Sequence, residues 1–215
     1  MQNDKQLQTD VEQELRYDPS VQSEQIGVSV RSGVVELDGH VDSYYGKWAA
    51  ERAAMRVTNT KALASEIKVE LPNSEIRTDE DMARTAMMHL DWNFSVPNTV
   101  KVQVTNGWVT LQGTTEWQFQ KEEAEKAVRP LKGVKWVTNE ITVVPKINAI
   151  DVKMQIESAL KRNAETDADH IKVETTDGKV TLSGHVRSWS AREEAEHAAW
   201  AAPGVTNVVD LIAIN

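Results

Sequence analysis

The sequence predicts an α+β protein made of three tandem α-β-β-α-β modules, each a three-stranded mixed sheet with two helices on one face. Three observations predict this fold. A short stretch bounded by glycines occurs three times, an amphipathic helical pattern precedes each copy, and an alanine-rich helical pattern follows it. The glycines stand six residues apart, at Gly33 and Gly39, Gly107 and Gly113, and Gly178 and Gly184. Self-similarity at a nearly constant period indicates a repeated structural unit.

Each unit opens with apolar residues that recur every four positions, which is the spacing of one face of an α-helix. These residues are Leu7, Val11 and Leu15, then Met82, Ala86 and Leu90, then Val152, Ile156 and Leu160. Thr78, with Asp81 three positions later, predicts where the second of these helices begins, because such a pair caps free backbone amides.

A β-hairpin follows the opening helix in each unit. The expected two-residue turns are Asn106-Gly107, Asp177-Gly178 and, as a weaker signal, Ser32-Gly33. A turn of this length sets apolar residues of the two strands opposite each other on one face of the sheet. The pairs are Val104 with Val109, Val102 with Leu111, Val30 with Val35 and Val28 with Leu37.

After each hairpin, small apolar residues recur at i, i+3, i+4 and i+7, which predicts a helix that lies close on the sheet. They are Ala50, Ala53, Ala54 and Val57; Ala124, Ala127, Val128 and Leu131; and Ala195, Ala198, Ala199 and Ala202. The residues that end these helices are Pro130 and Gly133, Pro203 and Gly204, and, in the place of the glycine, Asn59. A final strand is expected at Ile67–Val69, Ile141–Val143 and Val208–Ile214.

The linkers between the units are short, at Pro72–Ser74 and Pro145–Asn148. We therefore expect repeat 1 at residues 1–72, repeat 2 at residues 75–146 and repeat 3 at residues 148–215. Domains this small are marginally stable alone. We expect the repeats to contact one another, with repeat 2 supplying most of the apolar surface between them.

The composition limits the classes of function. Cysteine is absent, which excludes disulfides, thiolate metal sites and cysteine nucleophiles. No stretch reaches the roughly 18 to 20 consecutive apolar residues of a membrane span, and the N-terminus does not have the pattern of a secretory signal. We expect a cytoplasmic protein as the sequence is written, or a periplasmic one if it is a trimmed mature form. The net charge of −9 argues against nucleic acid as a partner.

Three sequence patterns resemble the BON domain, which is named after bacterial osmotically inducible and nodulation proteins. They are the hairpin core Gly33–Gly39 with its two partners, the "AExA" pattern of the second helix, and the "GVxxVxNxI" pattern of Gly133–Ile141. The resemblance covers almost the whole chain in three copies, and it departs from the family at Asn59-Thr60, where Gly-Val is usual. It implies a phospholipid-binding or interaction module of envelope and osmotic-stress proteins, not an enzyme. Relatives of the osmotic-stress type mostly carry a signal peptide, which this sequence does not show.

No catalytic or metal-binding motif is present in the sequence. His40 and His185 occupy equivalent positions, but Thr114 replaces them in repeat 2, and no partners stand at metal-ligand spacing. Glu51, Glu125 and Glu196 also recur, each beside the alanine stripe, without a second polar group to form an acid–base pair. We therefore expect no enzyme activity, no cofactor and no metal.

Aromatic and basic residues of repeat 2 are the candidate binding residues. The aromatic candidates stand at the edges of elements, where they suit a partner, a lipid headgroup or a neighbouring repeat: Trp92, Phe94, Trp108 and Trp117. The register of the hairpin points Trp108 toward the face of the sheet that the helices leave open. The basic candidates lie within 15 residues, where they form an anion-facing patch or complement a helix dipole: Lys121, Lys126, Arg129, Lys132 and Lys135.

The charge is distributed unevenly among the repeats. Residues 1–74 carry 8 basic and 12 acidic side chains, residues 75–146 carry 9 and 10, and residues 147–215 carry 7 and 11. The middle repeat therefore repels phosphate least. The sequence predicts a non-enzymatic binding or scaffold protein of the osmotic or envelope-stress type, with weak affinity for anionic phospholipid headgroups through repeat 2. The alternative is a protein–protein interaction module with no lipid role.

Overall fold

The computed structural model describes residues 4–145, 152–162 and 170–214. Within them, repeat 1 contains α1 (Asp4–Tyr17), β1 (Ile26–Arg31), β2 (Val34–Val41), α2 (Tyr44–Arg56), β3 (Ala62–Ser65) and β4 (Lys68–Val69). Repeat 2 contains α3 (Asp79–Trp92), β5 (Lys101–Thr105), β6 (Trp108–Gln112), β7 (Thr114–Thr115), α4 (Gln118–Val128), β8 (Trp136–Asn139) and β9 (Thr142–Val143). Repeat 3 contains α5 (Val152–Arg162), β10 (Ile171–Thr176), β11 (Lys179–Val186), α6 (Trp189–Trp200) and β12 (Asn207–Ile214). Short 3-10 turns at Ser23–Gln25 and Asn73–Glu75 connect elements. Of the second expected linker, residues 146–148 lie outside the described part of the chain.

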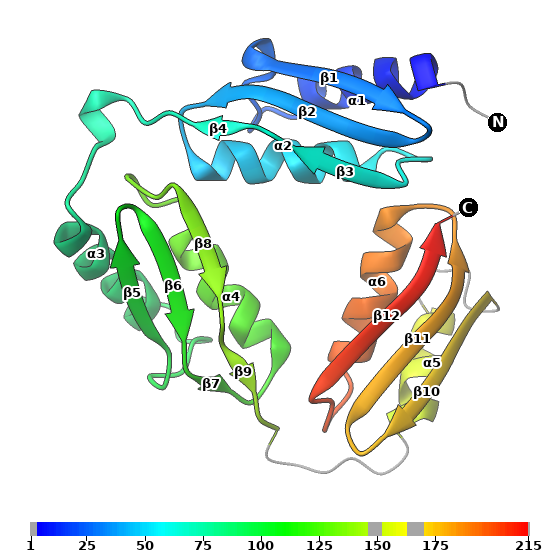
Figure 1. The fold of residues 1–215 in the computed structure, drawn as a ribbon. Helices are drawn as coiled ribbons and strands as arrows, with labels where there is room; N and C mark the ends of the chain where they lie inside the picture. The colour runs from blue at the N-terminus through cyan, green and yellow to red at the C-terminus, as the bar shows by residue number, and fades with distance from the viewer. Residues whose placement is uncertain (1–3, 146–151, 163–169, 215) are drawn as a thin grey trace.

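The predicted α+β fold of three tandem modules is confirmed. In each repeat the second strand lies at the centre of a mixed sheet, antiparallel to the strand before it and parallel to the last strand. The strand orders are β1-β2-β3, β5-β6-β8 and β10-β11-β12. Both helices of each module cover one face of its sheet, so the other face is open (Figure 1).

The expected final strands of repeats 1 and 2 were too short. They begin earlier, at Ala62 and Trp136, and are interrupted before their last residues, β4 and β9, pair again with the preceding strand. A polar residue stands at the interruption on the inward face: the Asn139 side chain accepts a hydrogen bond from the Ile141 amide (3.3 Å) and donates one to the Lys121 carbonyl (2.9 Å). In repeat 3 the Asp210 carboxylate accepts the equivalent bond from the Ile212 amide at 2.9 Å, and β12 continues without interruption, so this bond alone does not divide the strand.

The hairpin register is confirmed. Val104 lies opposite Val109 and Val102 opposite Leu111. Asn106 and Gly107 both have positive φ, 53° and 83°, the combination of a two-residue turn that matches the strand twist. The carboxylate of Asp79, the first residue of α3, accepts hydrogen bonds from both turn amides, at 2.6 Å and 3.0 Å. Asp4 does the same for the turn of repeat 1. The opening helix therefore holds the hairpin turn in place.

The second glycine of each pair has a separate steric reason. Gly113 has φ of 124°, and a Cβ at this position would lie 2.2 Å from the Thr99 carbonyl oxygen. The equivalent contacts at Gly39 and Gly184 would be 2.0 Å and 1.9 Å. No side chain fits at such a distance, so the chain before the first strand can cross the second strand only at a glycine.

The core of each repeat lies between its helices and its sheet. Most of the opening-helix residues and of the alanine stripe are buried as expected; for example, Val11, Ala50, Ala124 and Ala195 are 0% exposed. The others are partly buried against the same cores: Val57, Ala127, Leu131, Val152 and Ala198. Three clusters of buried side chains result, one for each repeat. One residue crosses between them: Tyr44 of repeat 1 belongs to the core cluster of repeat 2.

The three repeats form a cluster in which the second helices, α2, α4 and α6, lie on the inner side (Figure 1). The expected contact between repeats is confirmed by an ion pair from Arg52 of α2 to Glu193 of α6, at 3.3 Å, and by the contact of Tyr44 with repeat 2. The ion pair joins two helices, whereas the start of α2 in repeat 1 also reaches Trp136 of the β8 strand in repeat 2. Tyr44 and Trp48 of repeat 1 supply aromatic rings to its junction with repeat 2, where they contact Trp136 and Arg129. That repeat 2 supplies most of the apolar surface between repeats stays a prediction.

Candidate functional site

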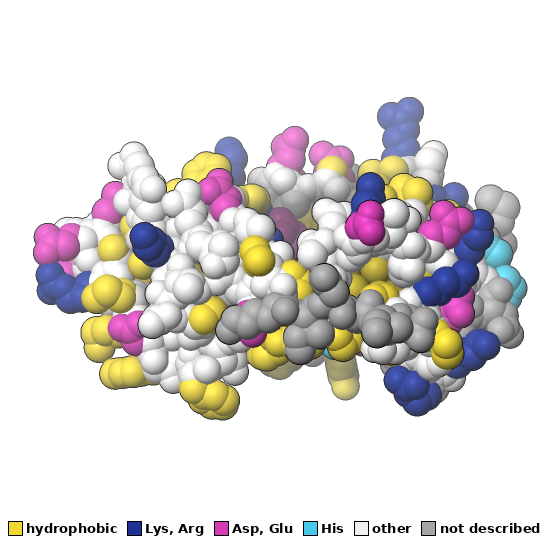
Figure 2. Space-filling view, turned by 90° about the horizontal axis from the view of Figure 1, so that it is seen from below, with side chains coloured by type: hydrophobic (Ala, Val, Ile, Leu, Met, Phe, Trp, Pro, Cys, Tyr) yellow, Lys and Arg dark blue, Asp and Glu magenta, His cyan; other side chains and the backbone are white. Residues whose placement is uncertain are grey.

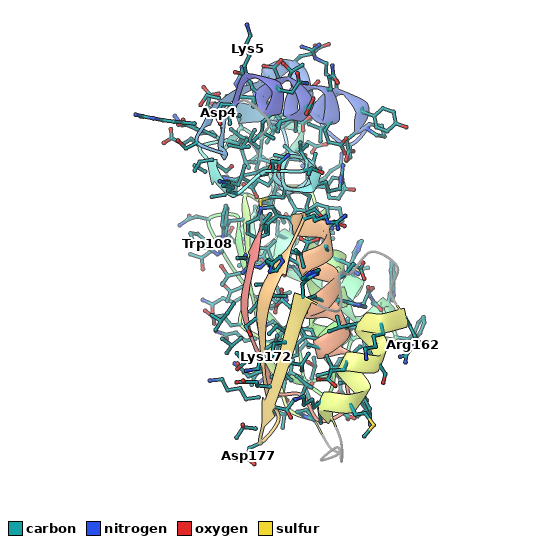
Figure 3. The ribbon with its side chains drawn as sticks, turned by 90° about the vertical axis from the view of Figure 1, so that its right-hand side faces the viewer. Asp4, Lys5, Trp108, Arg162, Lys172 and Asp177 are labelled. Carbon is teal, nitrogen blue, oxygen red and sulfur yellow. The ribbon has the colours of Figure 1, made fainter. Side chains whose placement is uncertain are left out.

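Two tryptophans lie side by side on the open sheet face of repeat 2. Trp108 of β6 is in register with Trp136 of β8, and their ring centroids are 6.1 Å apart. The Trp108 indole Nε1 donates a hydrogen bond to the Thr138 hydroxyl at 2.7 Å, which fixes the ring across the strands. Trp108 is 51% exposed and Trp136 is 38% exposed. Trp108 projects on the sheet side of the molecule, opposite to Arg162 of α5 (Figure 3). We call these two residues the tryptophan face.

The tryptophan face continues into the junction between repeats 1 and 2. The Tyr44 ring, at the start of α2, lies 5.6 Å from the Trp136 ring. Lys47, one turn further along α2, places its ammonium group 4.9 Å from the Trp136 centroid and donates a hydrogen bond to the Ile67 carbonyl at 2.9 Å. Burial of Tyr44 raises the pKa of its phenol, and the negative charge of Glu125 raises it further. The phenol therefore stays neutral at physiological pH.

Arg129 is a junction residue. Its guanidinium lies 3.9 Å from the centroid of the Trp48 ring of repeat 1 and forms an ion pair with Glu125 at 2.7 Å. The Arg129 side chain is only 10% exposed. A stacked, paired and largely buried guanidinium has no free face for a phosphate. Arg129 therefore connects repeats 1 and 2 and does not face solvent.

The remaining basic candidates do not form one open patch. Lys126 pairs with Glu123 at 2.9 Å, and this contact is the main cause that lowers the pKa of the Glu123 carboxyl. Lys132 pairs with Glu75 at 2.6 Å. Lys121 and Lys135 have no acidic partner among the described residues, but they belong to different elements, α4 and the loop before β8. The positive charge of this segment is mostly neutralised locally.

Exposed apolar side chains concentrate on repeat 2. Trp92, the last residue of α3, is 73% exposed, and Phe94, two positions later, is 98% exposed. Nine of the fourteen exposed large hydrophobic residues in the described part of the chain belong to this repeat: Ile76, Met87, Met88, Trp92, Phe94, Trp108, Phe119, Trp136 and Val144. Seen from below, the left-hand side, where repeat 2 lies in Figure 1, shows more hydrophobic than basic side chains (Figure 2).

The structure does not bring the predicted site residues together in one place. Trp108 lies on the sheet face, Trp92 and Phe94 lie at the end of α3, and Trp117 precedes the first residue of α4. Sequence reasoning missed Tyr44 and Trp136 as members of this surface. The signal for Trp136 was present in the sequence, because a parallel strand in register with β6 places it beside Trp108.

Among the residues that the structure describes, no three His, Asp or Glu side chains converge as metal ligands. The rings of His170 and His185 are 4.7 Å apart, but no third ligand joins them within the same residues. Nor is any helix in the described ranges long and apolar enough to cross a bilayer.

Comparison with known proteins places the chain in a family. The BON domain matches residues 3–70, 78–145 and 151–215. The osmotically-inducible protein Y of Escherichia coli (strain K12) is 36% identical over 123 residues, which cover 51% of this chain and 58% of that protein. The chain therefore spans less than two thirds of the length of this relative.

Two solved structures from type III secretion systems are also similar. The C-terminal domain of CdsD from Chlamydia trachomatis is 13% identical, with 96% of both chains covered and a TM-score of 0.27. The periplasmic domain of PrgH from S. typhimurium is 12% identical, with 89% of this chain and 95% of that chain covered and a TM-score of 0.23. Similarity at this level carries no argument about this chain. The three family matches and the repeated hairpin, helix and glycine geometry show instead that the chain belongs to the BON domain family, as three tandem copies.

Proposed function

We propose that this chain is a non-enzymatic binding protein of the osmotic-stress type, and that repeat 2 presents its binding surface to a protein partner. The observation that carries the proposal is the tryptophan face, an exposed aromatic pair on the repeat that carries most of the exposed large hydrophobic side chains of the described residues. The similarity to osmotically-inducible protein Y supports the association with osmotic stress.

The tryptophan face has the composition of a protein-binding surface. Tryptophan is the residue type most enriched at the energetic centres of protein interfaces, where polar neighbours surround it. Trp108 and Trp136 are flanked on the same face by Thr105, Thr110 and Thr138, which are uncharged. A partner can cover this area without desolvating an unpaired charge.

A lipid surface is the second candidate, and the exposure of Trp92 and Phe94 favours it. Aromatic rings at the end of a helix insert into the interfacial region of a bilayer. The electrostatic contribution is small, because the net charge of the chain is −9 and Lys126, Arg129 and Lys132 are paired with glutamates. Binding to anionic phospholipid would therefore depend on the aromatic rings more than on the lysines.

The two candidates are separated by two alanine variants of the full chain. Trp108→Ala removes the centre of the tryptophan face, and Trp92→Ala removes a ring at the end of α3 without touching the sheet. A partner is first isolated from osmotically stressed cells, then purified and titrated against both variants. We expect Trp108→Ala to weaken its binding about 30-fold, as for a 2 kcal/mol interface centre, and Trp92→Ala to weaken it less than about threefold. Equal affinities of the two variants would contradict the proposed surface.

The same variants test the lipid candidate by flotation with vesicles of phosphatidylglycerol or of phosphatidylcholine at low salt. Flotation with phosphatidylglycerol that Trp92→Ala abolishes and Trp108→Ala retains would establish lipid binding through the end of α3. Absence of flotation with both lipids would remove it. Fractionation of cells that express the native protein then distinguishes the cytoplasm from the periplasm.

A further inference from the structure

A pocket lies between repeats 2 and 3, outside the surface proposed above. Its walls come from the start of α4 and the end of α6, which face each other on the inner side of the cluster (Figure 1). Its volume is about 380 Å³, within the range of small-molecule sites. Three aromatic side chains line it, Trp117 and Phe119 from repeat 2 and Trp200 from repeat 3. The pocket exists only when the two repeats are together.

One carboxylate lines the pocket and a second contacts one of its aromatic walls. Glu122 lines the pocket directly. Glu196 lies one helical turn before Trp200 and accepts a hydrogen bond from the Trp200 indole at 3.4 Å. Burial raises the pKa of the Glu196 carboxyl, and among the further causes are the negative charges of Asp210 and Glu122. The two glutamates are therefore close enough to repel each other across the boundary between the repeats.

The arginine whose charge acts on Glu196 is paired with another carboxylate. Arg192 forms an ion pair with Asp210 and places its guanidinium 4.8 Å from the Trp189 ring. His197 lines the pocket and is the other ionisable group there besides Glu122, since the remaining lining residues are Gln118, Ala201 and the three aromatics. The pocket thus combines π-faces with negative charge.

We propose that this pocket binds a small quaternary ammonium cation of the size of choline. The faces of tryptophan and phenylalanine attract such cations, and aromatic-lined sites recognise them. A quaternary ammonium has no N–H group, so it needs no hydrogen-bond acceptors in an apolar wall. A primary ammonium or a guanidinium would lose its hydration shell there without replacement. Glu122 supplies the matching charge, and it disfavours zwitterions whose own carboxylate would lie beside it.

The proposal predicts a selectivity that shape alone does not give. Choline, its neutral isostere 3,3-dimethylbutan-1-ol and the zwitterion glycine betaine have similar sizes and differ in charge. Each is titrated against the full chain by calorimetry, with choline chloride compared with sodium chloride at matched ionic strength. We expect choline to bind at least about tenfold more tightly than the other two, since only choline brings a net positive charge to the aromatic faces.

Two variants with matched controls locate the binding. Trp200→Leu removes one aromatic wall, and we expect affinity for choline to fall about tenfold. Tyr17→Leu, which removes an exposed aromatic ring from repeat 1, is its control and should leave affinity unchanged. Glu122→Gln removes one charge from the pocket and should weaken binding about fivefold or more. Glu80→Gln, an exposed position on α3, makes the same change of charge away from the pocket.

Each other outcome overturns the proposal. Equal binding of choline and its neutral isostere would show an apolar pocket without recognition of charge. Absence of choline binding would show that the two repeats enclose no such site. If Trp200→Leu fails to fold, Glu122→Gln decides, because a partly exposed carboxylate is not part of the core; unchanged affinity in that variant refutes the site.

Discussion

Tyr44→Ala tests whether repeats 1 and 2 form one cooperative unit. Tyr44 is 8% exposed, lies at the start of α2 in repeat 1, and packs in the core of repeat 2 with Val109 and Leu111. Truncation of a buried aromatic side chain to alanine costs about 3–5 kcal/mol. Because Tyr44 lies at the edge of that core, we expect the low end of this range, about 3 kcal/mol. The loss should appear in repeat 2, although the substitution is in repeat 1.

Hydrogen exchange measures this loss separately in each repeat. The amides of β6, the central strand of repeat 2, report the opening of its core. A loss of 3 kcal/mol should accelerate their exchange about 100-fold. Tyr17→Ala, a change of the same type at a residue that is 86% exposed, should leave the exchange of β6 unchanged. If exchange in β6 is equally slow in both variants, the junction does not stabilise repeat 2 in solution and the reasoning is refuted.

Three further predictions concern single contacts. Gly113→Ala should lower the unfolding free energy of repeat 2 by about 3 kcal/mol or more in urea titrations, because the new Cβ would lie 2.2 Å from the Thr99 carbonyl oxygen at a φ of 124°. Its control, Gly46→Ala in α2, should change the unfolding free energy by less than about 1 kcal/mol. A double-mutant cycle of Trp48→Ala and Arg129→Ala should give a coupling energy of about 1 kcal/mol, and a coupling near zero would contradict the cation–π contact. Burial raises the folded-state pKa of the Glu196 carboxyl, so the folded state binds more protons than the unfolded state. The stability of the fold should therefore fall as pH rises from the unfolded-state pKa through the folded-state pKa. Glu196→Gln should remove that fall in thermal melts of the full chain at different pH values.

The internal structure of each repeat could be predicted from the sequence, because its signals are local. The turn at Asn106-Gly107 sets the hairpin register, and the alanine stripe sets the face of the second helix. The left-handed cap was also predictable at Asn59, which has φ of 72° where Gly133 has 92°. The one departure from the family pattern is accommodated: Thr60 is fully buried and its hydroxyl donates to the Ala54 carbonyl at 3.1 Å. The early start and the interruption of the last strand in repeats 1 and 2 were not predicted.

Only part of the pairing of the basic residues could be predicted from the sequence. Lys126 with Glu123 and Arg129 with Glu125 stand at helical spacing, whereas pairing between distant elements leaves no local pattern. Lys132 stands three positions from Arg129 and three from Lys135, but its ion-pair partner Glu75 lies almost sixty residues earlier in the chain. Arg129 appears as one more basic residue after a helix, and only the packing of repeat 1 places the Trp48 ring against it. A run of lysines and arginines therefore predicts an anion-binding patch only when the acidic residues of neighbouring elements lie elsewhere.

The arrangement of the three repeats is encoded where the repeats differ. Trp48, Glu122 and Glu193 occupy the same position of the second helix in repeats 1, 2 and 3. In each repeat this position faces a neighbour: Trp48 contacts Arg129, Glu122 lines the pocket beside Trp200, and Glu193 pairs with Arg52. Two positions further on, Ala50, Ala124 and Ala195 are identical because they all pack on their own sheets. The shared positions therefore build the module, and the divergent position beside them gives each boundary its own chemistry: a cation–π contact, a ligand-sized pocket and an ion pair. If Trp48 and Glu193 were exchanged, each module would keep its own core, but the Trp48–Arg129 contact and the Arg52–Glu193 ion pair would both be lost. The contacts between repeats therefore depend on which repeat carries which residue at this position.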